Sequence, residues 1–420
     1  ATKLGDKLGK KKKAEITLID AKKTHIWKPL LHEIAAGSIN PDKDELDYLA
    51  QGFWHGFKFR LGRMDKLDRE KKEVSLEPYF DNEGNEIIAR RNFKYDTLVM
   101  SIGSSVNDFS VKGAAEFSIA LDNQNQAERF HNRLHNAIVK AQTQKTKIQP
   151  GQLEVVIVGA GATGVELAAE LHKATREMTA YGLENIDPDK DIRINLIEAS
   201  PRLLPALPLR ISQAVADELR KLKVNLFLGE RVTEVTSEGI KTHKDRKILS
   251  SLVVWAAGIK APDFLKNLSG LETNNINQLK VKSTLQTTLD ENIFAFGDCA
   301  SCPISPGAIE NVPPRAQAAH QQASLLYKTI IKLVNGNNKL PQYVYKDYGS
   351  LVNLGRYSTV GNLMGSILGG NMFIEGLIAK LMYLSLYQMH LVALHGYAST
   401  LFRFLGKLFS HRTETRVKLH

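Results

Sequence analysis

The chain begins with a helical pattern that leads into an apolar strand. Leu4 and Leu8 are four residues apart and therefore share one face of a helix. Residues 14–20, AEITLID, have the apolar composition of a strand, and this strand ends on Asp20. Because no strand pattern precedes the helix, we expect the chain to begin inside a structural unit.

Strand and helix patterns alternate along the rest of the chain, which predicts an α/β architecture. Residues 57–91 contain alternating stretches around a turn at residues 81–85, and we expect antiparallel hairpins there. Residues 93–103, FKYDTLVMSIG, are expected to form a buried strand that ends in a tight turn. A polar helix is expected within residues 122–152, and the Pro-Gly pair near its end marks the start of a second unit.

The strongest local pattern is LEVVIVGAGATGVELAAEL, residues 153–171. A strand leads directly into Gly159, Gly161 and Gly164, and a helix-forming stretch follows. Such glycines permit a tight turn, close approach of the backbone to a pyrophosphate, and packing of the helix on the strand. The positive end of the helix dipole adds about 1 kcal/mol in favour of an anion. The pattern predicts a dinucleotide site, with a purely structural glycine turn as the alternative.

An acidic residue should end the next strand of such a unit and hold a ribose. DIRINLIEAS supplies Glu198, which follows Gly159 by 39 residues, because residues 178–191 resemble an inserted loop. A carboxylate there favours NADH over NADPH, although the nearby Arg202 leaves the choice open. Asp20 has the corresponding place in the first unit, but its glycine turn, expected about 20 residues earlier, is absent from the sequence.

Two further strands end in small or acidic residues that suit a second nucleotide. They are SLVVWAAGIKAP, residues 251–262, and NIFAFGDCA, residues 292–300, which contains Asp298. Together with residues 14–20 and 97–103, they resemble the two-dinucleotide flavoproteins, in which an NADH unit interrupts an FAD unit. The resemblance implies that Asp20 holds the adenosine ribose of FAD and Asp298 its ribityl chain, while Asp298 as a simple turn residue remains the alternative.

Three features narrow the resemblance to type II NADH:quinone oxidoreductases, single-subunit NADH dehydrogenases. They are THIWKPLLHEIAAG at residues 24–37, PPRAQAAHQQA at residues 313–323, and a long apolar C-terminal tail. The resemblance implies two Rossmann-like domains and a C-terminal helical membrane segment. It also implies oxidation of NADH through noncovalent FAD and reduction of a quinone without proton pumping. With the first glycine turn absent, retention of FAD is expected to be weakened.

The same resemblance implies a set of site residues. The FAD site would comprise Asp20, Lys28, Pro29, Leu30, Ser101, Gly103, Asp298, Ala316 and Gln317. The NADH site would comprise Gly159, Gly161, Ala162, Thr163, Gly164, Glu166, Glu198, Ala257 and Gly258. The catalytic residues would be Glu166, Gln317 and Gln321. No metal ligand is expected.

These catalytic assignments have structural alternatives. Gln317 and Gln321 lie one helical turn apart and present two amides to one face, which the family uses to line the quinone site. Two such glutamines are otherwise ordinary solvated residues. Glu166 is expected near the nicotinamide and flavin, yet a first-turn glutamate also stabilises a helix start, and Glu170 could be the inward-facing acid instead.

Cys299 and Cys302 have the C-x-x-C spacing of a redox dithiol, so a disulfide reductase is an alternative function. Related disulfide reductases carry their cysteines earlier in the fold, which argues against this role. Two cysteines make no disulfide framework and indicate a reducing compartment. No cluster of His or Cys suggests a zinc site.

The charge balance bears on the partners. Lys and Arg total 56 against 45 Asp and Glu, a net charge of +11 that favours an anionic surface such as a lipid membrane. A basic NADH-binding flavoprotein acting as a membrane or nucleic-acid adaptor is the runner-up, although nucleic acid is the less expected partner.

The C-terminal tail is expected to attach the protein to a membrane without crossing it. Residues 381–402 lack charge, but polar residues such as Gln388, His390 and His395 interrupt them. The following residues form a basic amphipathic pattern suited to the interface. Its apolar and basic members are Leu401, Phe402, Leu405, Leu408 and Phe409 with Arg403, Lys407 and Arg412. We expect a homodimer at the cytoplasmic face of the inner membrane.

The expected domain division has four parts. Residues 1–121 form the first part of the FAD domain and residues 122–282 form the NADH domain. Residues 283–345 complete the FAD domain, and residues 346–420 attach to the membrane.

Overall fold

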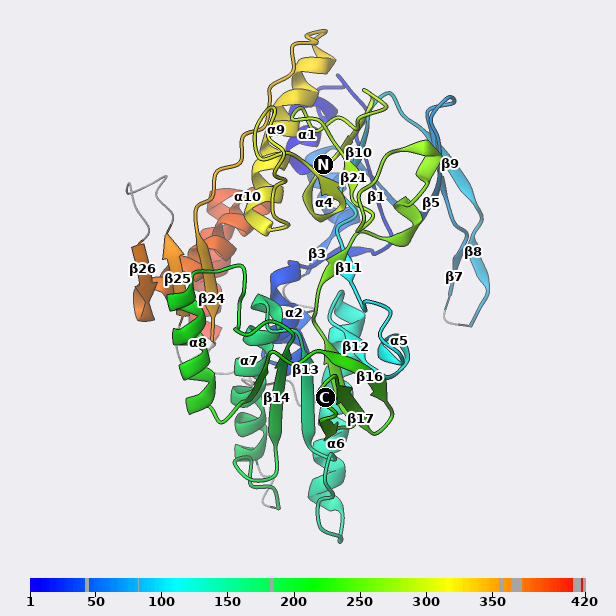
Figure 1. Cartoon of the computed structure of the whole chain (residues 1–420). Coiled ribbons are helices and arrows are strands. Elements are labelled where there is room, and N and C mark those ends of the chain that lie inside the picture. Colours follow the sequence, from blue (N-terminus) through cyan, green and yellow to red (C-terminus); the bar gives the residue numbers. More distant parts are fainter. Residues whose placement is uncertain are drawn as a thin grey trace. The chain divides into compact units, whose positions relative to one another are not determined.

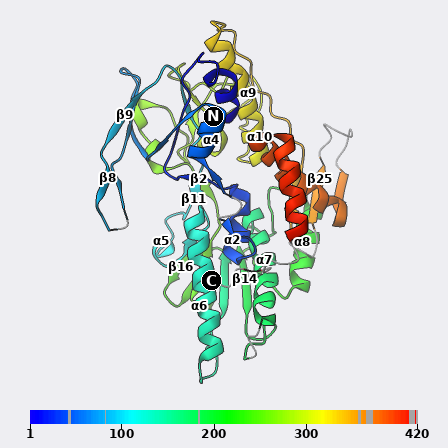
Figure 2. The same ribbon diagram turned by 180° about the vertical axis from the view of Figure 1, so that it is seen from behind.

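The chain is described from a computed structural model (Figure 1) and is seen from behind in Figure 2. The structure describes residues 1–41, 45–81, 83–181, 185–354, 359–363, 372–410 and 417. Two compact units are present, each assembled from separate segments. Unit 1 contains Ala1–His25, Glu45–Ser105 and Ile259–Asp347, and unit 2 contains Ile26–Asp44, Val106–Gly258 and Tyr348–His420. The finer four-part division remains a prediction.

Unit 1 begins as the sequence predicts. The helix α1 (Thr2–Leu4) continues into a π-helical turn (Gly5–Gly9), and Leu8 is buried. The strand β1 (Thr17–Asp20) pairs in parallel with β4 (Lys58–Leu61), which follows the helix α4 (Tyr48–His55). Between them lies a short antiparallel pair, β2 (Thr24–His25) and β3 (Leu46–Asp47). Asp20 therefore stands at a strand end, as expected.

The hairpins predicted at residues 57–91 are confirmed except at β4, which pairs in parallel with β1 and belongs to no hairpin. The strands β5 (Met64–Asp68), β6 (Glu73–Leu76) and β9 (Arg91–Lys94) form an antiparallel sheet, and β7 (Tyr79–Phe80) pairs with β8 (Glu86–Ile88). The single strand predicted at residues 93–103 is wrong. A bend at residues 96–97 separates β9 from β10 (Leu98–Met100), because the two strands pair with different partners, β6 and β22.

The remaining elements of unit 1 surround its apolar core. The strand β22 (Ile293–Ala295) pairs in parallel with β10, β21 (Leu279–Lys280) pairs with β23 (Ala300–Ser301), and β20 (Ile259–Lys260) opens this part of the chain. Three 3-10 turns occur at Asp263–Leu265, Leu268–Gly270 and Gly297–Cys299. The long helix α9 (Ala316–Val334) buries Leu326 and Ile330. β22 is wholly buried, which explains its continuous apolar sequence.

Unit 2 is built on a parallel five-stranded sheet with the order β12-β19-β13-β14-β15. These strands are Ile119–Ala120, Leu252–Trp255, Glu154–Val158, Arg193–Glu198 and Asn225–Leu228. The long helices are α6 (Gln124–Thr143), α7 (Ala162–Ala180) and α8 (Leu209–Lys221). Both β13 and β19 are almost entirely buried, as expected for central strands of a parallel sheet.

Shorter elements complete this part of unit 2. They are a 3-10 turn (Lys28–Leu30), α2 (Leu31–Ala36), α5 (Ala114–Phe117) and the antiparallel sheet of β16 (Val232–Thr236), β17 (Gly239–Thr242) and β18 (Lys247–Leu249). The strand β11 (Ser105–Val106) contains the point at which the chain passes from unit 1 to unit 2. The helix α2 packs against both α6 and α7 (Figure 2). This packing places its His32 and Glu33 beside α7.

The C-terminal part of unit 2 is a small sheet followed by one broken helix. The strands β24 (Ser350–Asn353), β25 (Thr359–Leu363) and β26 (Met372–Glu375) are antiparallel, and β25 lies beside both α8 and α10 (Figure 1). The helix α10 (Gly376–Ser410) is broken at Gly396, where φ is 77°. Within the described residues, none of the helices has the length and hydropathy needed to cross a bilayer.

Candidate active site

The glycine turn between β13 and α7 has the predicted form. Gly159 has φ of +102°, and a Cβ there would lie 2.7 Å from the Ala257 backbone. A Cβ on Gly164 would lie 1.9 Å from the Gly159 carbonyl oxygen, so helix and strand could not keep their contact. Around Gly161 no atom lies within 4 Å of such a Cβ, which leaves the backbone open to a ligand. Each glycine therefore has the backbone environment that its position predicts.

Glu198 lies at this glycine turn even though 39 residues separate it from Gly159. One carboxylate oxygen accepts a hydrogen bond from the Ala160 amide and the other from the Ser200 amide, both at 2.8 Å. The carboxylate keeps further acceptor capacity for hydroxyl groups. Ala162 and Thr163 open α7, where the first amides of a helix have no acceptor within the helix. The residues thus suit a dinucleotide with a free ribose diol.

Arg202 does not compete for this position. Its guanidinium donates to the carbonyl oxygens of Pro205 and Leu207, each at 2.7 Å. Ala257 and Gly258 follow β19 and lie beside the turn, where Gly258 has φ of +64°. Because Arg202 is held by backbone carbonyls, it is not available to a 2′-phosphate, which favours a cofactor without that group.

In unit 1, two of the predicted FAD residues stand at strand ends, since Asp20 is the last residue of β1 and Asp298 follows β22. Asp20 accepts hydrogen bonds from the Lys22 amide at 2.8 Å and from the Tyr48 hydroxyl at 3.0 Å. Burial and Asp20 together raise the pKa of Tyr48, so its hydroxyl stays protonated and acts as a donor. Tyr48 was missed from the sequence because it lies 28 residues from Asp20.

Asp298 is held in place by residues from two distant segments. The Ser104 hydroxyl donates to its carboxylate at 2.8 Å, and the Gln278 side chain donates to its carbonyl oxygen at 2.9 Å. Gln322 accepts a hydrogen bond from the Gly297 amide at 2.8 Å. Ser101 and Gly103 precede Ser104, and no atom lies within 4 Å of a Cβ at Gly103. The open space at Gly103 beside a fixed carboxylate suits a polyhydroxyl ligand.

Gln317 and Gln321 lie on one face of α9, as predicted, but they contact a neighbouring segment. Ala316 begins the helix. The Gln317 amide donates to the Asp347 carboxylate at 3.1 Å, and the Gln321 amide donates to the Lys346 carbonyl oxygen at 2.7 Å. Both glutamines are therefore oriented by residues 346–347, which Arg315 also holds through Asp347 at 3.0 Å.

Of the other predicted FAD residues, Lys28, Pro29 and Leu30 form a 3-10 turn in unit 2. Leu30 is buried, whereas Lys28 is exposed. Lys28 acts electrostatically on Asp122, whose pKa is raised by burial. These three residues belong to unit 2, whereas Asp298 and the residues that hold it belong to unit 1.

Glu166 is buried within unit 2. Burial raises the pKa of its carboxyl group to about 8, and the negative charge of Glu33 adds to this effect. The Asn353 amide donates to Glu166 at 3.0 Å and acts in the opposite direction. At neutral pH the side chain is thus a neutral acid, which is the form that can release a proton.

Glu170 lies one turn further along α7 and is also buried, but it forms an ion pair. It accepts hydrogen bonds from the Ser38 hydroxyl and the Lys173 ammonium group. His32 lies near both acids, and burial lowers its pKa to about 4. Sequence reasoning assigned no role to His32. The sequence LHE contains two neighbouring titratable residues, His32 and Glu33. That they lie on a helix packed against α7 could be learned only from the fold.

The two cysteines are free and buried. Burial raises the pKa of Cys299 to about 11 and that of Cys302 to about 12. A dithiol that attacks a disulfide needs a thiolate near neutral pH, so this environment disfavours such chemistry.

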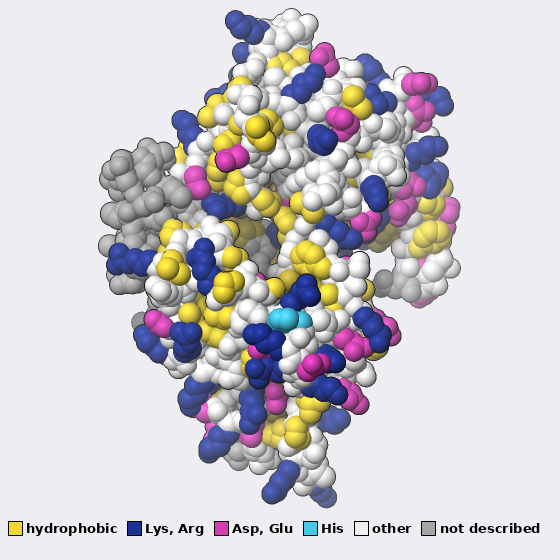
Figure 3. Space-filling model, in the orientation of Figure 1, with side chains coloured by type: hydrophobic (Ala, Val, Ile, Leu, Met, Phe, Trp, Pro, Cys, Tyr) yellow, Lys and Arg dark blue, Asp and Glu magenta, His cyan; other side chains and the backbone are white. Residues whose placement is uncertain are grey.

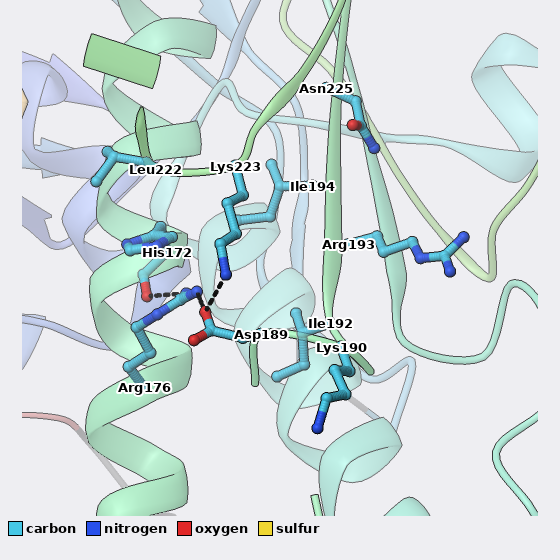
Figure 4. A pocket seen from close by; sticks show the side chains of 10 residues that line it. All are labelled: His172, Arg176, Asp189, Lys190, Ile192, Arg193, Ile194, Leu222, Lys223 and Asn225. Atoms are coloured by element: carbon cyan, nitrogen blue, oxygen red, sulfur yellow. Dashed lines mark hydrogen bonds and ion pairs between the residues drawn. The ribbon is translucent and has the colours of Figure 1, made fainter. Parts of the chain in front are cut away.

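A separate cavity of about 440 Å³ lies at the amino-terminal ends of strands in the unit 2 sheet, opposite the end that carries the glycine turn (Figure 4). Arg193 and Asn225 are the first residues of β14 and β15, whereas the glycine turn follows the last residue of β13. Arg176 pairs with Asp189, and Lys223 lies 3.8 Å from the same carboxylate (Figure 4). The cavity is therefore distinct from the predicted dinucleotide site, and its cations already have partners.

Comparison with known proteins connects this arrangement to one family. The pyridine nucleotide-disulphide oxidoreductase family model matches residues 2–323. A type II NADH:quinone oxidoreductase of Haemophilus influenzae is 41% identical, with 100% of this chain and 96% of the relative covered. The corresponding Mycobacterium tuberculosis protein is 27% identical, with 96% and 85% covered. The solved Plasmodium falciparum NDH2 in complex with NADH shares the fold at a TM-score of 0.81 and 18% identity, with 97% and 95% covered.

Proposed function

Because the chain belongs to the type II NADH:quinone oxidoreductase family, we propose that it oxidises NADH and reduces a quinone while attached to a membrane. It is a flavoenzyme whose cofactors are FAD and NADH. Members of this family do not pump protons. The observation that carries the proposal is the full-length relationship together with Glu198 at the glycine turn.

The NADH site of this proposal lies in unit 2. Gly159, Gly161 and Gly164 with the start of α7 receive the pyrophosphate, since a helix start provides free amides and a positive dipole end. Glu198 binds the ribose hydroxyls, and Ala257 with Gly258 borders the turn. The helix-start residues Ala162 and Thr163 complete the group.

In the proposal, FAD is held mainly by residues at or just after the ends of the strands β1, β10 and β22. Asp20 binds a ribose, Asp298 binds the ribityl hydroxyls, and Ser101 and Gly103 leave room for the ligand. Lys28, Pro29, Leu30 and Ala316 are further proposed contacts. When bound, FAD supplies the two-electron chemistry between NADH and the quinone. The protein supplies orientation and electrostatics.

The quinone end of the reaction is assigned to α9 and Glu166. Gln317 and Gln321 are fixed by Asp347 and Lys346, so their amides have defined directions. Glu166 is a neutral acid at neutral pH and is suited to proton transfer. We assign catalytic roles to these three residues.

Membrane attachment is proposed for α10. The helix exposes a series of large apolar side chains, which favours burial in a lipid interface. They are Leu381, Leu384, Leu386, Met389, Leu401, Phe402 and Leu405. Arg403 is exposed beside this series, whereas Arg412 lies outside the described residues. We further propose the four-part division at residues 121, 282 and 345, a homodimer, and attachment at the cytoplasmic face of the inner membrane.

Steady-state oxidation of NADH with different acceptors tests this function. A water-soluble quinone should support rapid turnover, whereas a disulfide such as cystine should support none, because Cys299 and Cys302 are buried with raised pKa values. The double variant C299S/C302S should retain quinone reduction. Turnover with cystine that disappears in the double variant would favour a disulfide reductase instead.

A further inference from the structure

The helix α4 of unit 1 presents three large apolar side chains to solvent. The exposed fraction is 65% for Leu49, 84% for Phe53 and 58% for Trp54. Leu49 and Phe53 are four residues apart and share one face of the helix, and Trp54 follows Phe53 directly. Single exposed apolar residues are common on proteins, but three neighbouring ones on a helix of two turns mark a contact surface.

The rest of the helix is fixed so that these side chains stay outward. Gln51 and Gly52 are buried on its inner side. At its start, the Asp47 carboxylate accepts a hydrogen bond from the Ala50 amide at 2.7 Å. At its end, Gly56 has φ of +70°, which ends the helix. The apolar side chains of α4 are therefore exposed on an ordered element.

A run of four lysines, Lys10–Lys13, lies against the end of α4. The helix α4 packs beside α1 and the π-helical turn, as both views of the ribbon show (Figures 1 and 2). A Cβ on Gly56 would lie 2.7 Å from the Cγ atom of Lys10. The run itself is ordered, since the Lys12 amide donates a hydrogen bond to the Gly9 carbonyl oxygen at 2.9 Å. Positive charge is thereby held next to the exposed apolar side chains.

Three of the four lysines keep their charge available. Lys10 pairs with Asp6 at 2.6 Å, and Asp6 also contacts the His55 ring at 2.8 Å, which links the lysine run to α4. Lys11–Lys13 are all exposed. In the part of the chain that the structure describes, none of these three lysines forms an ion pair.

We propose that the three apolar side chains of α4 and the Lys10–Lys13 run form a second membrane-contact surface, which binds an anionic lipid bilayer. An anionic bilayer offers negative headgroups to the lysines and an apolar layer directly beneath them to Leu49, Phe53 and Trp54. A tryptophan ring also suits the boundary between these two layers. A second copy of the chain complements the surface less well, because a two-fold contact would add like charges from two lysine runs.

This α4 surface acts together with α10 and rests on the membrane attachment proposed for that helix. Three apolar side chains and three lysines on a short helix and turn bind a bilayer only weakly by themselves. Once α10 is bound, a second contact of the same chain forms at a high effective concentration. The surface therefore holds unit 1 at a bilayer that contains anionic lipid and releases it where such lipid is absent.

Fluorescence of Trp54 on vesicles tests the proposal directly. Brominated lipids quench a tryptophan that enters the bilayer interface, and the part of the quenching that Trp54→Phe removes belongs to Trp54. With full-length protein on brominated phosphatidylcholine vesicles, this part should be at least about two-fold larger when phosphatidylglycerol is included. High salt should reduce the difference, because the lysines are exposed.

Two triple variants with equal charge changes provide the decisive comparison. The first, K11Q/K12G/K13Q, should abolish the increase caused by phosphatidylglycerol. Glycine suits position 12, where φ is +52°. The second, K66Q/K71Q/K72G, also removes three exposed lysines of unit 1, and φ of Lys72 is +51°. It should leave the increase unchanged.

The apolar part of the surface has its own matched pair. Phe53→Ser should reduce the Trp54 quenching on phosphatidylglycerol vesicles about two-fold or more, since Phe53 would enter the same layer. The control Phe80→Ser, an exposed phenylalanine of β7 in unit 1, should leave it unchanged. Sedimentation velocity without lipid should give the same oligomeric state for wild type and Phe53→Ser.

Several results would overturn the α4 surface. Quenching of Trp54 that is equal with and without phosphatidylglycerol, or an equal loss in both triple variants, would do so. A changed oligomeric state in Phe53→Ser would assign this face to a contact between copies instead. Flotation of wild-type protein with the vesicles but without Trp54 quenching would refute this surface alone, whereas no flotation at all would also refute the attachment through α10.

Discussion

Among single residues, Glu198 gives the sharpest test of cofactor choice. Glu198→Gln keeps the shape of the side chain but removes the charge that favours ribose hydroxyls and repels a 2′-phosphate. We expect the KM for NADH to rise about ten-fold and the preference over NADPH to shrink. Steady-state kinetics with both nucleotides measures this. The control Glu154→Gln, on the same sheet but at the start of β13, should leave both constants unchanged.

Gln317 and Gln321 can be tested through the two half-reactions. Replacing either residue by Leu should slow flavin reoxidation by quinone more than flavin reduction by NADH, since we assign both amides to the quinone end of the reaction and residues 346–347 fix their directions. Stopped-flow mixing separates the steps. Equal slowing of both half-reactions would indicate a general packing defect.

Glu166 should also make stability depend on pH. Its pKa is about 8 in the folded chain against 4.5 for the free side chain, so the folded state holds the proton more tightly. This contribution is fully present below about pH 4.5 and is lost as the pH rises toward 8. Urea unfolding should therefore show a wild-type free energy that falls relative to Glu166→Gln over this range. A constant difference between the two proteins would contradict the raised pKa.

The residues that could be predicted from the sequence are those whose role depends on local backbone. Gly159, Gly161 and Gly164 are defined by one strand and one helix, and the structure confirms their turn. Tyr48 and Ser104 could not be predicted, because they contact Asp20 and Asp298 through long-range packing. The position of His32 beside Glu166 has the same origin.

Among the elements, α10 depends on a stacking contact with the segment before α2. The Trp27 ring lies 5.3 Å from Tyr387 and 5.4 Å from His390, measured between centroids. Trp27→Ala removes both contacts, each worth about 1 kcal/mol, and should increase amide exchange in α10. NADH binding should persist, since its predicted residues lie on other elements. The exposed Trp54 of α4 provides the control, and equal exchange in Trp54→Ala would contradict this account.

The elements also show where pattern reading fails. The strand β13 and the helix α7 on either side of the glycine turn each have a clear local sequence pattern. Both were therefore predicted almost as they occur. Residues 93–103 contain two strands that belong to different sheets, and no local signal distinguishes them from one.

For the whole molecule, charge and apolar exposure make different predictions about membrane attachment. On the face in Figure 3, Lys and Arg are dispersed among Asp and Glu rather than gathered in one patch. The apolar side chains of α10 should therefore dominate binding, at about 25 cal/mol for each Å² buried. High salt should release only part of the protein from acidic vesicles, whereas deletion from Leu377 onward should release it all. Complete release by salt alone would refute this.

Electron flow from NADH through a bound flavin to a quinone is the central step of the proposed function. Anaerobic addition of NADH to the purified protein should bleach its visible flavin absorbance, and a water-soluble quinone should then restore it without oxygen. Glu198→Gln should require more NADH for the same bleaching. Bleaching that quinone cannot reverse, or a flavin-loaded protein that NADH cannot bleach, would contradict the account.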